Sequence, residues 1–215
     1  MNIPTYTQKK KVLLFDFDGT LVDSFAAITN TLDNLADEFG YSRLANMEIL
    51  RQKPIKDIIK DLNIPFIKLP GLIKRARADL KKQIPLLDPI ASIIEVLETL
   101  KNSGFSMAII TSNTVENVDL FLKNHNITVF DTVYSDNSFF GKYKVINRFL
   151  KKFNIAQKDA IYIGDEIRDI EASYKSGIQV IAVTWGFNSK EILEQYKPDF
   201  LVSTPAELLE VIENL

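Results

Sequence analysis

Two aspartates stand two positions apart where a short apolar run ends. The run covers residues 12–15, and it is followed by Asp16-Phe17-Asp18-Gly19-Thr20. Because side chains alternate along a strand, Asp16 and Asp18 would point to the same side if the extended geometry continues past the run. Buried carboxylates are costly without partners or a metal ion, so this pair suits a catalytic or metal-binding site. The simpler alternative is an Asp-Gly turn that ends a strand.

A segment with two hydroxyl side chains ends the second apolar strand that we expect. It reads Thr111-Ser112-Asn113, and a helix is predicted from about Thr114. Hydroxyl groups and free backbone N–H groups at a helix N-terminus form a site for an anion such as phosphate. The alternative is that Ser112 or Asn113 only caps the helix.

Three acidic residues lie within five positions at a later strand–helix junction. The segment reads Gly164-Asp165-Glu166-Ile167-Arg168-Asp169. We expect Asp165 at the end of the strand and Asp169 in the first turn of the helix. Oxygen ligands in this arrangement suit a hard divalent cation. The alternative is a helix whose first turn carries acids because the helix dipole favours them there.

Two lysines precede another predicted helix, in the segment Gly141-Lys142-Tyr143-Lys144. A lysine in this loop could reach the strand ends and balance the charges of a phosphate and a carboxylate. We take Lys142, directly after Gly141, as the site residue and Lys144 as the second choice. The alternative for either lysine is a solvated side chain, which is the common position of lysine in proteins.

Short apolar runs without alternation recur along the chain and predict strands that are buried on both faces. They cover residues 12–15, 105–111, 129–135, 160–164, 179–184 and 200–202. Helical patterns lie between them, and we expect helices to begin at Asp88-Pro89 and, with a capping box, at Thr204. Strands that alternate with helices across short loops predict an α/β fold with a doubly wound, Rossmann-like parallel sheet.

Residues 25–87 interrupt this alternation, because they contain helical patterns and no convincing strand. The patterns cover residues 26–39, 46–52, 54–62 and 69–82. We therefore expect an inserted all-helical cap domain over residues 25–87 and a core domain made of residues 1–24 and 88–215. The cap is expected over the carboxyl edge of the sheet, where open α/β sheets bind ligands. The basic residues between positions 68 and 82 are interpreted as a solvated helix face.

The composition limits the functions and the metals that this chain can support. The 215 residues carry a net charge of −2, no cysteine and one histidine, His125. This charge gives no general attraction for nucleic acid or an anionic membrane. A metal would be held mainly by oxygen ligands, which points to magnesium or manganese. Residues 1–11 lack the apolar part of a signal peptide, and no run reaches the roughly 18 apolar residues of a membrane span, so we expect a cytoplasmic protein.

Three of the four segments that suggest chemistry fall at the carboxyl ends of predicted strands. In a right-handed doubly wound sheet with the first strand in the centre, these ends lie together. Each alternative accounts for one segment, but none accounts for three segments at the same edge. We therefore expect a single site that combines the aspartate pair, the anion-binding loop, the lysine and the second set of acids.

The ordered motifs resemble those of the haloacid dehalogenase-like hydrolases, in the phosphoglycolate phosphatase-like branch with a helical cap after the first strand. The resemblance covers nearly the whole chain. The motifs are, in order, Asp16-Phe17-Asp18-Gly19-Thr20-Leu21-Val22-Asp23-Ser24, then Thr111-Ser112-Asn113, then Lys142, then Gly164-Asp165-Glu166-Ile167-Arg168-Asp169. The resemblance implies a phosphatase that acts on a small phosphorylated metabolite, with Mg²⁺ as its cofactor.

The same resemblance implies a role for each motif residue. Asp16 would attack phosphorus and form an aspartyl-phosphate, while Asp18 would exchange protons with the leaving group and with water. Asp16, the backbone carbonyl of Asp18, and Asp165 would bind the magnesium ion. Glu166 and Asp169 would support the ion from behind these ligands. The residues that would hold the phosphate are Gly19, Thr111, Ser112, Asn113 and Lys142.

Some features leave alternatives open. Many relatives carry Lys-Pro in the third motif, whereas this chain has Lys142-Tyr143-Lys144. The dehalogenase branch lacks the second acid of the first motif, so Asp18 favours a phosphatase. A sugar phosphomutase of the same fold and a catalytically silent binding or regulatory protein are the alternatives. No residue of the expected cap indicates the substrate, and the sequence does not indicate the oligomeric state.

Overall fold

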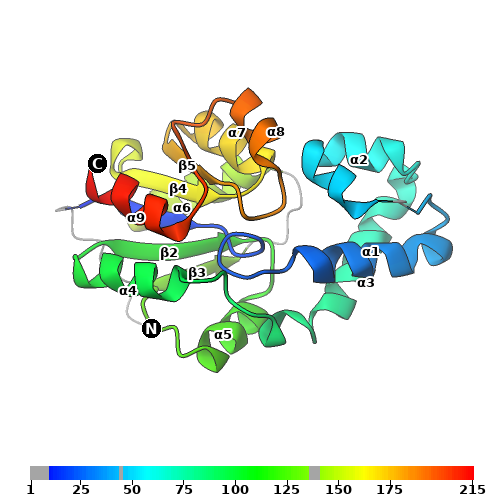
Figure 1. Ribbon diagram of the computed structural model, residues 1–215, viewed down its shortest axis with the longest axis horizontal. Helices are drawn as coiled ribbons and strands as arrows, with labels where there is room; N and C mark the ends of the chain where they lie inside the picture. Colours follow the sequence, from blue (N-terminus) through cyan, green and yellow to red (C-terminus); the bar gives the residue numbers. More distant parts are fainter. Residues whose placement is uncertain (1–9, 44–45, 136–140) are drawn as a thin grey trace.

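The computed structural model describes residues 10–43, 46–135 and 141–215, and its centre is a six-stranded sheet (Figure 1). The strand order is β3-β2-β1-β4-β5-β6, and every neighbouring pair is parallel. The predicted doubly wound sheet, with the first strand in the centre, is therefore confirmed. The prediction about the N-terminal segment concerns residues 1–9, which lie outside the described residues.

The strands correspond closely to the apolar runs of the sequence. They are β1 (Val12–Phe15), β2 (Ser106–Thr111), β3 (Thr132–Ser135), β4 (Ala160–Gly164), β5 (Gln179–Val183) and β6 (Phe200–Val202). Only β3 differs by more than one residue, because it begins at Thr132 rather than at 129. Val129 packs into the core instead, and the side chain of Asp131 accepts a hydrogen bond from the backbone N–H of Met107 at 2.9 Å.

Helices connect the strands and occupy the long interval after β1. The α-helices are α1 (Phe25–Phe39), α2 (Ile55–Asp61), α3 (Leu69–Leu80), α4 (Ile93–Asn102), α5 (Val115–Asn124), α6 (Lys142–Phe153), α7 (Ile167–Ser176), α8 (Lys190–Gln195) and α9 (Pro205–Glu213). Short 3₁₀ helices are η1 (Met47–Gln52), η2 (Phe66–Lys68), η3 (Ile84–Leu86) and η4 (Gln157–Asp159). Within the described ranges, no helix combines the length and apolar character needed to cross a membrane.

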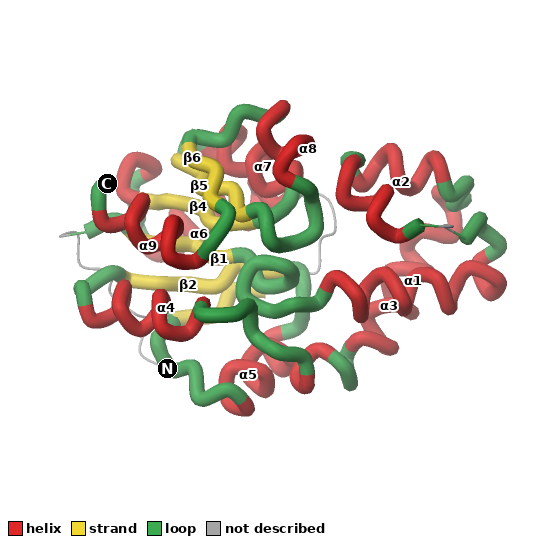
Figure 2. The backbone as a smooth tube through the Cα atoms, viewed as in Figure 1, coloured by secondary structure: helices red, strands yellow, loops and turns green. Residues whose placement is uncertain are grey.

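Helices cover both faces of the sheet (Figure 2). Leu13 and Phe15 of β1 lie in a core with α4, α5 and α9, whereas Val12 and Leu14 lie in a second core with α6 and α7. Because successive side chains of a strand point to opposite faces, burial on both sides requires an apolar residue at every position. This requirement explains why the strands appear in the sequence as unbroken apolar runs.

The register of the central strands brings three strand ends to the same level. Phe15, the last residue of β1, pairs with Ile109 of β2 and with Ile163 of β4. The chain passes from β1 to β2 and β3 on one side and returns to β4, β5 and β6 on the other. Such a change of direction leaves a crevice at the carboxyl ends of the strands, and open α/β sheets bind ligands there.

The helical insertion (residues 25–87) lies mostly beyond this carboxyl edge (Figure 1), and its end at η3 packs against the core under the sheet through Ile84. Its helices share an apolar core that includes Leu35, Ile58 and Leu72. α1 ends at Gly40, whose φ of 67° is the left-handed conformation that glycine commonly supplies after a helix. The predicted helical character of this stretch agrees with the structure, except that the segment after position 46 is the 3₁₀ helix η1 and positions 44 and 45 lie outside the described residues.

The predicted start of a helix at Asp88-Pro89 is wrong, because α4 begins at Ile93. The backbone N–H of Asp23 donates to the carbonyl of Asp88 at 3.0 Å, and that of Ile90 donates to the carbonyl of Leu21 at 2.9 Å. The segments that enter and leave the helical insertion are thus hydrogen-bonded to each other. Residues 88–90 use their backbone groups for this pairing rather than for a first helical turn.

The predicted capping box at the last helix is correct in part. The side chain of Thr204 accepts a hydrogen bond from the backbone N–H of Glu207 at 3.2 Å, as an N-cap residue does. The carboxylate of Glu207 accepts from the backbone N–H of Ser203 at 2.7 Å, one residue before the position that a capping box requires.

The burial of apolar side chains in the core between the sheet and α4, α5 and α9 predicts which of them contribute to stability. Leu97 of α4 is buried in the first core, whereas Leu120 of α5 is exposed. We expect Leu97→Ala to lower the free energy of unfolding by about 3 kcal/mol, because it removes buried surface and leaves a cavity. Leu120→Ala is the matched control, and we expect a change within about 0.5 kcal/mol. Urea unfolding of the two variants tests this prediction, and equal effects would contradict it.

Candidate active site

Three aspartates meet at the carboxyl edge of the sheet. Asp16 follows β1 and Asp165 follows β4, and the backbone N–H of Asp16 continues the ladder by donating to the carbonyl of Ile163 at 2.8 Å. Asp169 belongs to the first turn of α7. All three side chains are buried, and they offer carboxylate oxygens that lie within 4.8 Å of one another. The sheet therefore brings together acids that are far apart in the sequence.

Lys142 is the cation that contacts this group of acids. Its Nζ lies 2.6 Å from Oδ2 of Asp16 and also forms an ion pair with Asp169. From the sequence we expected Lys142 in the loop before this helix. In the structure it is the first residue of α6. Burial by itself lowers the pKa of Lys142, but the charges of the two aspartates outweigh it and raise the pKa above its ordinary value. Lys144 is exposed, and its Nζ lies over the ring of Tyr143.

Asp165 is held by groups from two loops. Its Oδ1 accepts a hydrogen bond from the hydroxyl of Thr20 at 2.6 Å, and its Oδ2 accepts one from the backbone N–H of Phe187 at 2.6 Å. A Cβ added at Gly19 or at Gly186 would lie 2.3 Å from Oδ2 of Asp165. Gly19, which we predicted as a phosphate-binding residue, thus also lets the β1 loop approach this carboxylate closely.

Asp18 lies beside the three acids in a different environment. Its Oδ2 accepts a hydrogen bond from Nδ2 of Asn113 at 3.3 Å, while its buried Oδ1 has no hydrogen-bond partner among the described residues. Burial, and after it the charge of Asp16, raises the pKa of Asp18 to about 6. A carboxyl group with such a pKa can give up and regain a proton near neutral pH.

Some polar groups of the loop after β2 form hydrogen bonds within the loop itself. The hydroxyl of the buried Thr111 accepts a hydrogen bond from the backbone N–H of Asn113 at 2.9 Å. Thr114, rather than Ser112 or Asn113, caps α5 by accepting from the backbone N–H of Asn117 at 3.3 Å. Oδ1 of Asn113 also accepts hydrogen bonds from the backbone N–H of Thr114 at 2.8 Å and from Nδ2 of Asn117 at 3.0 Å. Ser112 and Asn113 line a cavity together with Asp18.

Comparison with known proteins gives matches along most of the chain. A family profile described as haloacid dehalogenase-like hydrolase matches residues 13–183. The chain belongs to the haloacid dehalogenase-like hydrolases.

Individual members of this family match the chain from end to end. A phosphoglycolate phosphatase from Synechococcus elongatus is 28% identical over 208 residues, which cover 95% of this chain and 98% of the relative. The pyrophosphatase PpaX from Bacillus velezensis is 25% identical over 206 residues, with 93% and 94% covered. The crystal structure of a predicted phosphatase from Clostridium acetobutylicum superimposes with a TM-score of 0.83 at 26% identity and covers 99% of this chain and 100% of that one. The predicted family and the predicted enzyme class, a phosphatase, are confirmed.

The acids of this haloacid dehalogenase-like hydrolase fit a divalent cation. Burial, and then the charges of Glu166, Asp16 and Asp169, raise the pKa of Asp165 well above its ordinary value. Burial also raises the pKa of Asp169 to about 6, although Lys142 opposes the shift. Several carboxylates buried together favour the binding of a cation, because its charge offsets their mutual repulsion. Oxygen ligands prefer hard cations such as Mg²⁺. Asp169, which we predicted to act from behind the ligands, lies as close to the group as Asp16 and Asp165 do.

Two arginines join the site in addition to the predicted residues. Arg168 of α7 donates to Glu166 at 2.5 Å, so the carboxylate of Glu166 is paired with this arginine. Arg77 of α3 lines the same cavity as Arg168, and their mutual repulsion adds to the effect of burial in lowering the pKa of Arg77. We had interpreted the basic residues of this helix as a solvated face, and that is wrong for Arg77. The sequence does contain an indication of this position. Arg77 lies four residues after Ile73, and residues at this spacing share one side of a helix, here the apolar side of α3.

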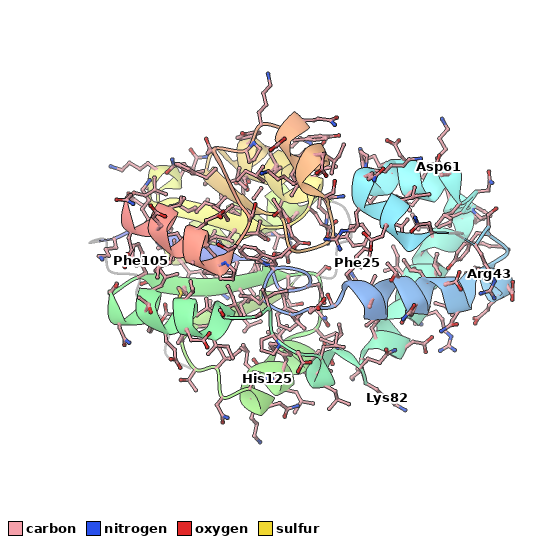
Figure 3. The ribbon with its side chains drawn as sticks, in the orientation of Figure 1. Phe25, Arg43, Asp61, Lys82, Phe105 and His125 are labelled. Atoms are coloured by element: carbon pink, nitrogen blue, oxygen red, sulfur yellow. The ribbon has the colours of Figure 1, made fainter. Side chains whose placement is uncertain are left out.

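The segment after β5 also contributes to the site. Trp185 packs against the core and donates to the carbonyl of Thr20 at 3.2 Å. Phe187 differs, because its backbone binds Asp165 and its ring lines the cavity. That ring meets Phe25 edge to face, with ring centroids 5.4 Å apart. Phe25 is the first residue of α1 and is labelled in Figure 3. His125 is half-buried away from the acids, and its Nε2 lies 2.9 Å from the carbonyl oxygen of Leu87.

The raised pKa of Asp18 predicts how stability depends on pH without metal. The folded state disfavours ionised Asp18, so this group lowers stability as pH rises from about 4 to about 6. Asp18→Asn removes that penalty, and we expect it to stabilise the metal-free protein at pH 7.5 by up to about 3 kcal/mol more than at pH 4.

Thermal unfolding in EDTA at the two pH values measures this difference. Asp23→Asn is the control, because it removes an exposed carboxylate from the same loop. We expect a much smaller change between the two pH values for this variant. A stability difference between Asp18→Asn and the wild type that is the same at both pH values would count against the prediction.

Proposed function

We propose that this enzyme is a magnesium-dependent phosphatase that hydrolyses a small phosphate monoester through an aspartyl-phosphate on Asp16. The substrate would be phosphoglycolate-like or another phosphorylated metabolite, as for the phosphoglycolate phosphatase that the chain resembles. One observation supports this proposal above all others. Lys142 contacts Asp16 and Asp169 at once, beside Asp165, so a lysine and a set of cation ligands share one buried place.

The balance of charges explains why both a lysine and a cation are needed. An anionic carboxylate that approaches an anionic phosphate is repelled by about 4 kcal/mol at 4 Å for each pair of charges, at an effective dielectric constant near 20. Asp16, Asp165 and Asp169 would each add such repulsion. A divalent cation held by Asp16, Asp165 and the backbone carbonyl of Asp18, with Asp169 close by, neutralises the phosphate and the attacking group when it is bound.

Each protein group then has a defined part in the displacement. A carboxylate oxygen of Asp16 forms a bond to phosphorus while the bond from phosphorus to the leaving oxygen breaks. Asp18 gives its proton to that oxygen, so the leaving group departs as an alcohol. Water then attacks the phosphorus of the aspartyl-phosphate, Asp18 takes up its proton, and inorganic phosphate leaves with Asp16 restored. The pKa of Asp18, about 6, suits a group that acts as an acid and then as a base.

The remaining predicted residues would position the phosphate. Ser112 and Asn113 line the cavity beside Asp18, and Lys142 reaches the same place from α6. Thr111 would act by holding the loop, because its hydroxyl is bonded to the backbone of Asn113. We propose that residues 25–87 form a cap domain on a core of residues 1–24 and 88–215, and that this cap covers the leaving group.

Replacement of Asp16 tests the proposed nucleophile. We expect Asp16→Asn to reduce kcat by on the order of a thousandfold or more, because the neutral amide is a poor nucleophile. Phosphate release from p-nitrophenyl phosphate, with and without Mg²⁺, is the measurement, and EDTA should abolish the activity of the wild type. Full activity of Asp16→Asn would disprove the mechanism.

The same assay separates the alternatives. Transfer of phosphate to a sugar hydroxyl in place of water would identify a phosphomutase. A folded protein that releases no phosphate from any ester, with or without metal, would indicate a binding or regulatory protein.

Lys142 and Lys144 allow a matched test of whether a buried ammonium group is needed beside Asp16. Lys142→Ala removes the ammonium that contacts Asp16, and we expect kcat/KM to fall by about a hundredfold or more, since a buried charge at this distance contributes several kcal/mol. Lys144→Ala removes an exposed lysine two positions away, and we expect activity within about twofold of the wild type. The reverse order of effects would show that Lys144 is the site lysine.

A further inference from the structure

A cavity extends from the catalytic residues into the interior of the helical insertion. Its volume is about 190 Å³. At the core end it is lined by Asp18, Ser112, Asn113, Glu166 and Arg168, and so by the proposed proton donor and two of the proposed phosphate-binding residues. At the other end it reaches Ile58, Ile59, Leu62 and Leu72, which are buried residues of the insertion's own core. The cavity therefore runs from Asp18, the proposed acid, to the centre of the insertion.

Polar and apolar residues are separated along this cavity. The polar side chains that line it, apart from Tyr41, come from the core or from its junction with α1 and α3, and Arg77 is the charged residue that the insertion contributes. The rest of the insertion's lining is apolar except for Tyr41, and it includes Ile28, Leu32, Ile55, Ile64, Ile73 and Leu80. The hydroxyl of Tyr41 donates to the backbone carbonyl of Leu32, so that hydroxyl is already satisfied. A ligand that enters this part meets hydrocarbon.

Such a space is unusual in a small helical core. Protein interiors are packed to about the density of organic crystals, and voids much larger than a water molecule are rare. An engineered apolar cavity of about 150 Å³ in another protein stays dry and binds benzene. The cavity described here has a volume of about 190 Å³ with its polar end included, and the apolar walls of its inner part offer water few partners. An apolar group of six or more carbon atoms would fit it better than water does.

We propose that the preferred substrate is a phosphate monoester whose leaving group is an apolar alcohol of about six carbons. This alcohol occupies the inner, apolar part of the cavity, lined by Ile58, Ile59, Leu62 and Leu72, which we call the chamber. The proposal rests on the proposed phosphatase function and specifies its substrate class. The leaving oxygen lies next to Asp18, which lines the cavity, so the carbon chain attached to that oxygen points into the insertion. The phosphate stays at the polar end with Ser112, Asn113 and Lys142.

The main rival is a short, acidic leaving group that pairs with Arg77. Such a group would place one charge beside the arginine and leave the apolar part of the chamber unfilled. The two substrate classes make opposite predictions about chain length, because only an apolar alcohol gains affinity from each added methylene.

The test uses a series of n-alkyl phosphates with the magnesium-loaded enzyme. Ethyl, butyl and hexyl phosphate have leaving groups of nearly equal chemical reactivity, so differences in kcat/KM report binding in the chamber. We expect about a fourfold increase for each buried methylene, and therefore on the order of a hundredfold between ethyl and hexyl phosphate. Phosphoglycolate serves as the short acidic comparison, and we expect it to be a poorer substrate than hexyl phosphate.

Two variants on α3 test whether the dependence of kcat/KM on chain length arises in the chamber. Ala76 is buried and lines the chamber, so Ala76→Leu fills part of it. We expect this variant to lose at least about tenfold in kcat/KM for hexyl phosphate and far less for ethyl phosphate. Ala78, exposed on the same helix, gives the control Ala78→Leu, which should keep the wild-type dependence on chain length. Thermal unfolding of both variants shows that each one is folded.

A binding measurement on the wild type gives a second readout that needs neither turnover nor a variant. Hexylphosphonate, which cannot be hydrolysed, should raise the melting temperature of the magnesium-loaded enzyme more than ethylphosphonate does at the same concentration. A flat or falling kcat/KM from ethyl to hexyl phosphate, or preference for phosphoglycolate without any effect of Ala76→Leu, would overturn the proposal and leave the phosphatase function intact. Absence of magnesium-dependent release from every ester would instead overturn the proposed function.

Discussion

The crowding of buried carboxylates around Lys142 is the constraint on which the site depends. Asp16, Asp165 and Asp169 lie within 4.8 Å of one another, and Lys142 contacts two of them. Burial, and after it the charges of the neighbouring acids, raise the pKa values of Asp165 and Asp169, and the single ammonium group of Lys142 does not offset this. The fold thus accepts repulsion among these acids in a place where a bound cation would relieve it.

The sheet can withstand this repulsion because the acids are fixed by the strongest part of the structure. Asp16 and Asp165 extend two neighbouring central strands, and every strand residue of β1 and β4 is buried. Two glycines, Gly19 and Gly186, allow two loops to close on Asp165, where any larger residue would collide with it. Hydrogen bonds from Thr20 and Phe187 then fix the direction of this carboxylate. The position of these carboxylates is therefore set by backbone packing and not by flexible side chains.

The helical insertion adds a second environment to this charged edge. Its paired entry and exit segments hold it at the carboxyl end of the sheet, and Phe25 meets Phe187 at the junction. On the core side the cavity is polar, and on the insertion side it is mostly apolar with a single arginine, Arg77. A molecule with a charged end and an apolar end matches this division, because each end would leave water for surroundings of its own kind.

The sequence by itself determined the parallel sheet, the family and the group of catalytic candidates. These depend on local patterns: strands buried on both faces must be apolar throughout, and the aspartates of the motifs directly follow such runs. Tertiary structure decided what depends on contacts across the chain. It placed Lys142 rather than Lys144 on Asp16, because the start of α6 points only one of them inward. It turned Arg77 into the cavity and made Asp88-Pro89 a paired linker instead of a helix start. No local pattern encodes such contacts, since they exist only after distant segments have packed together.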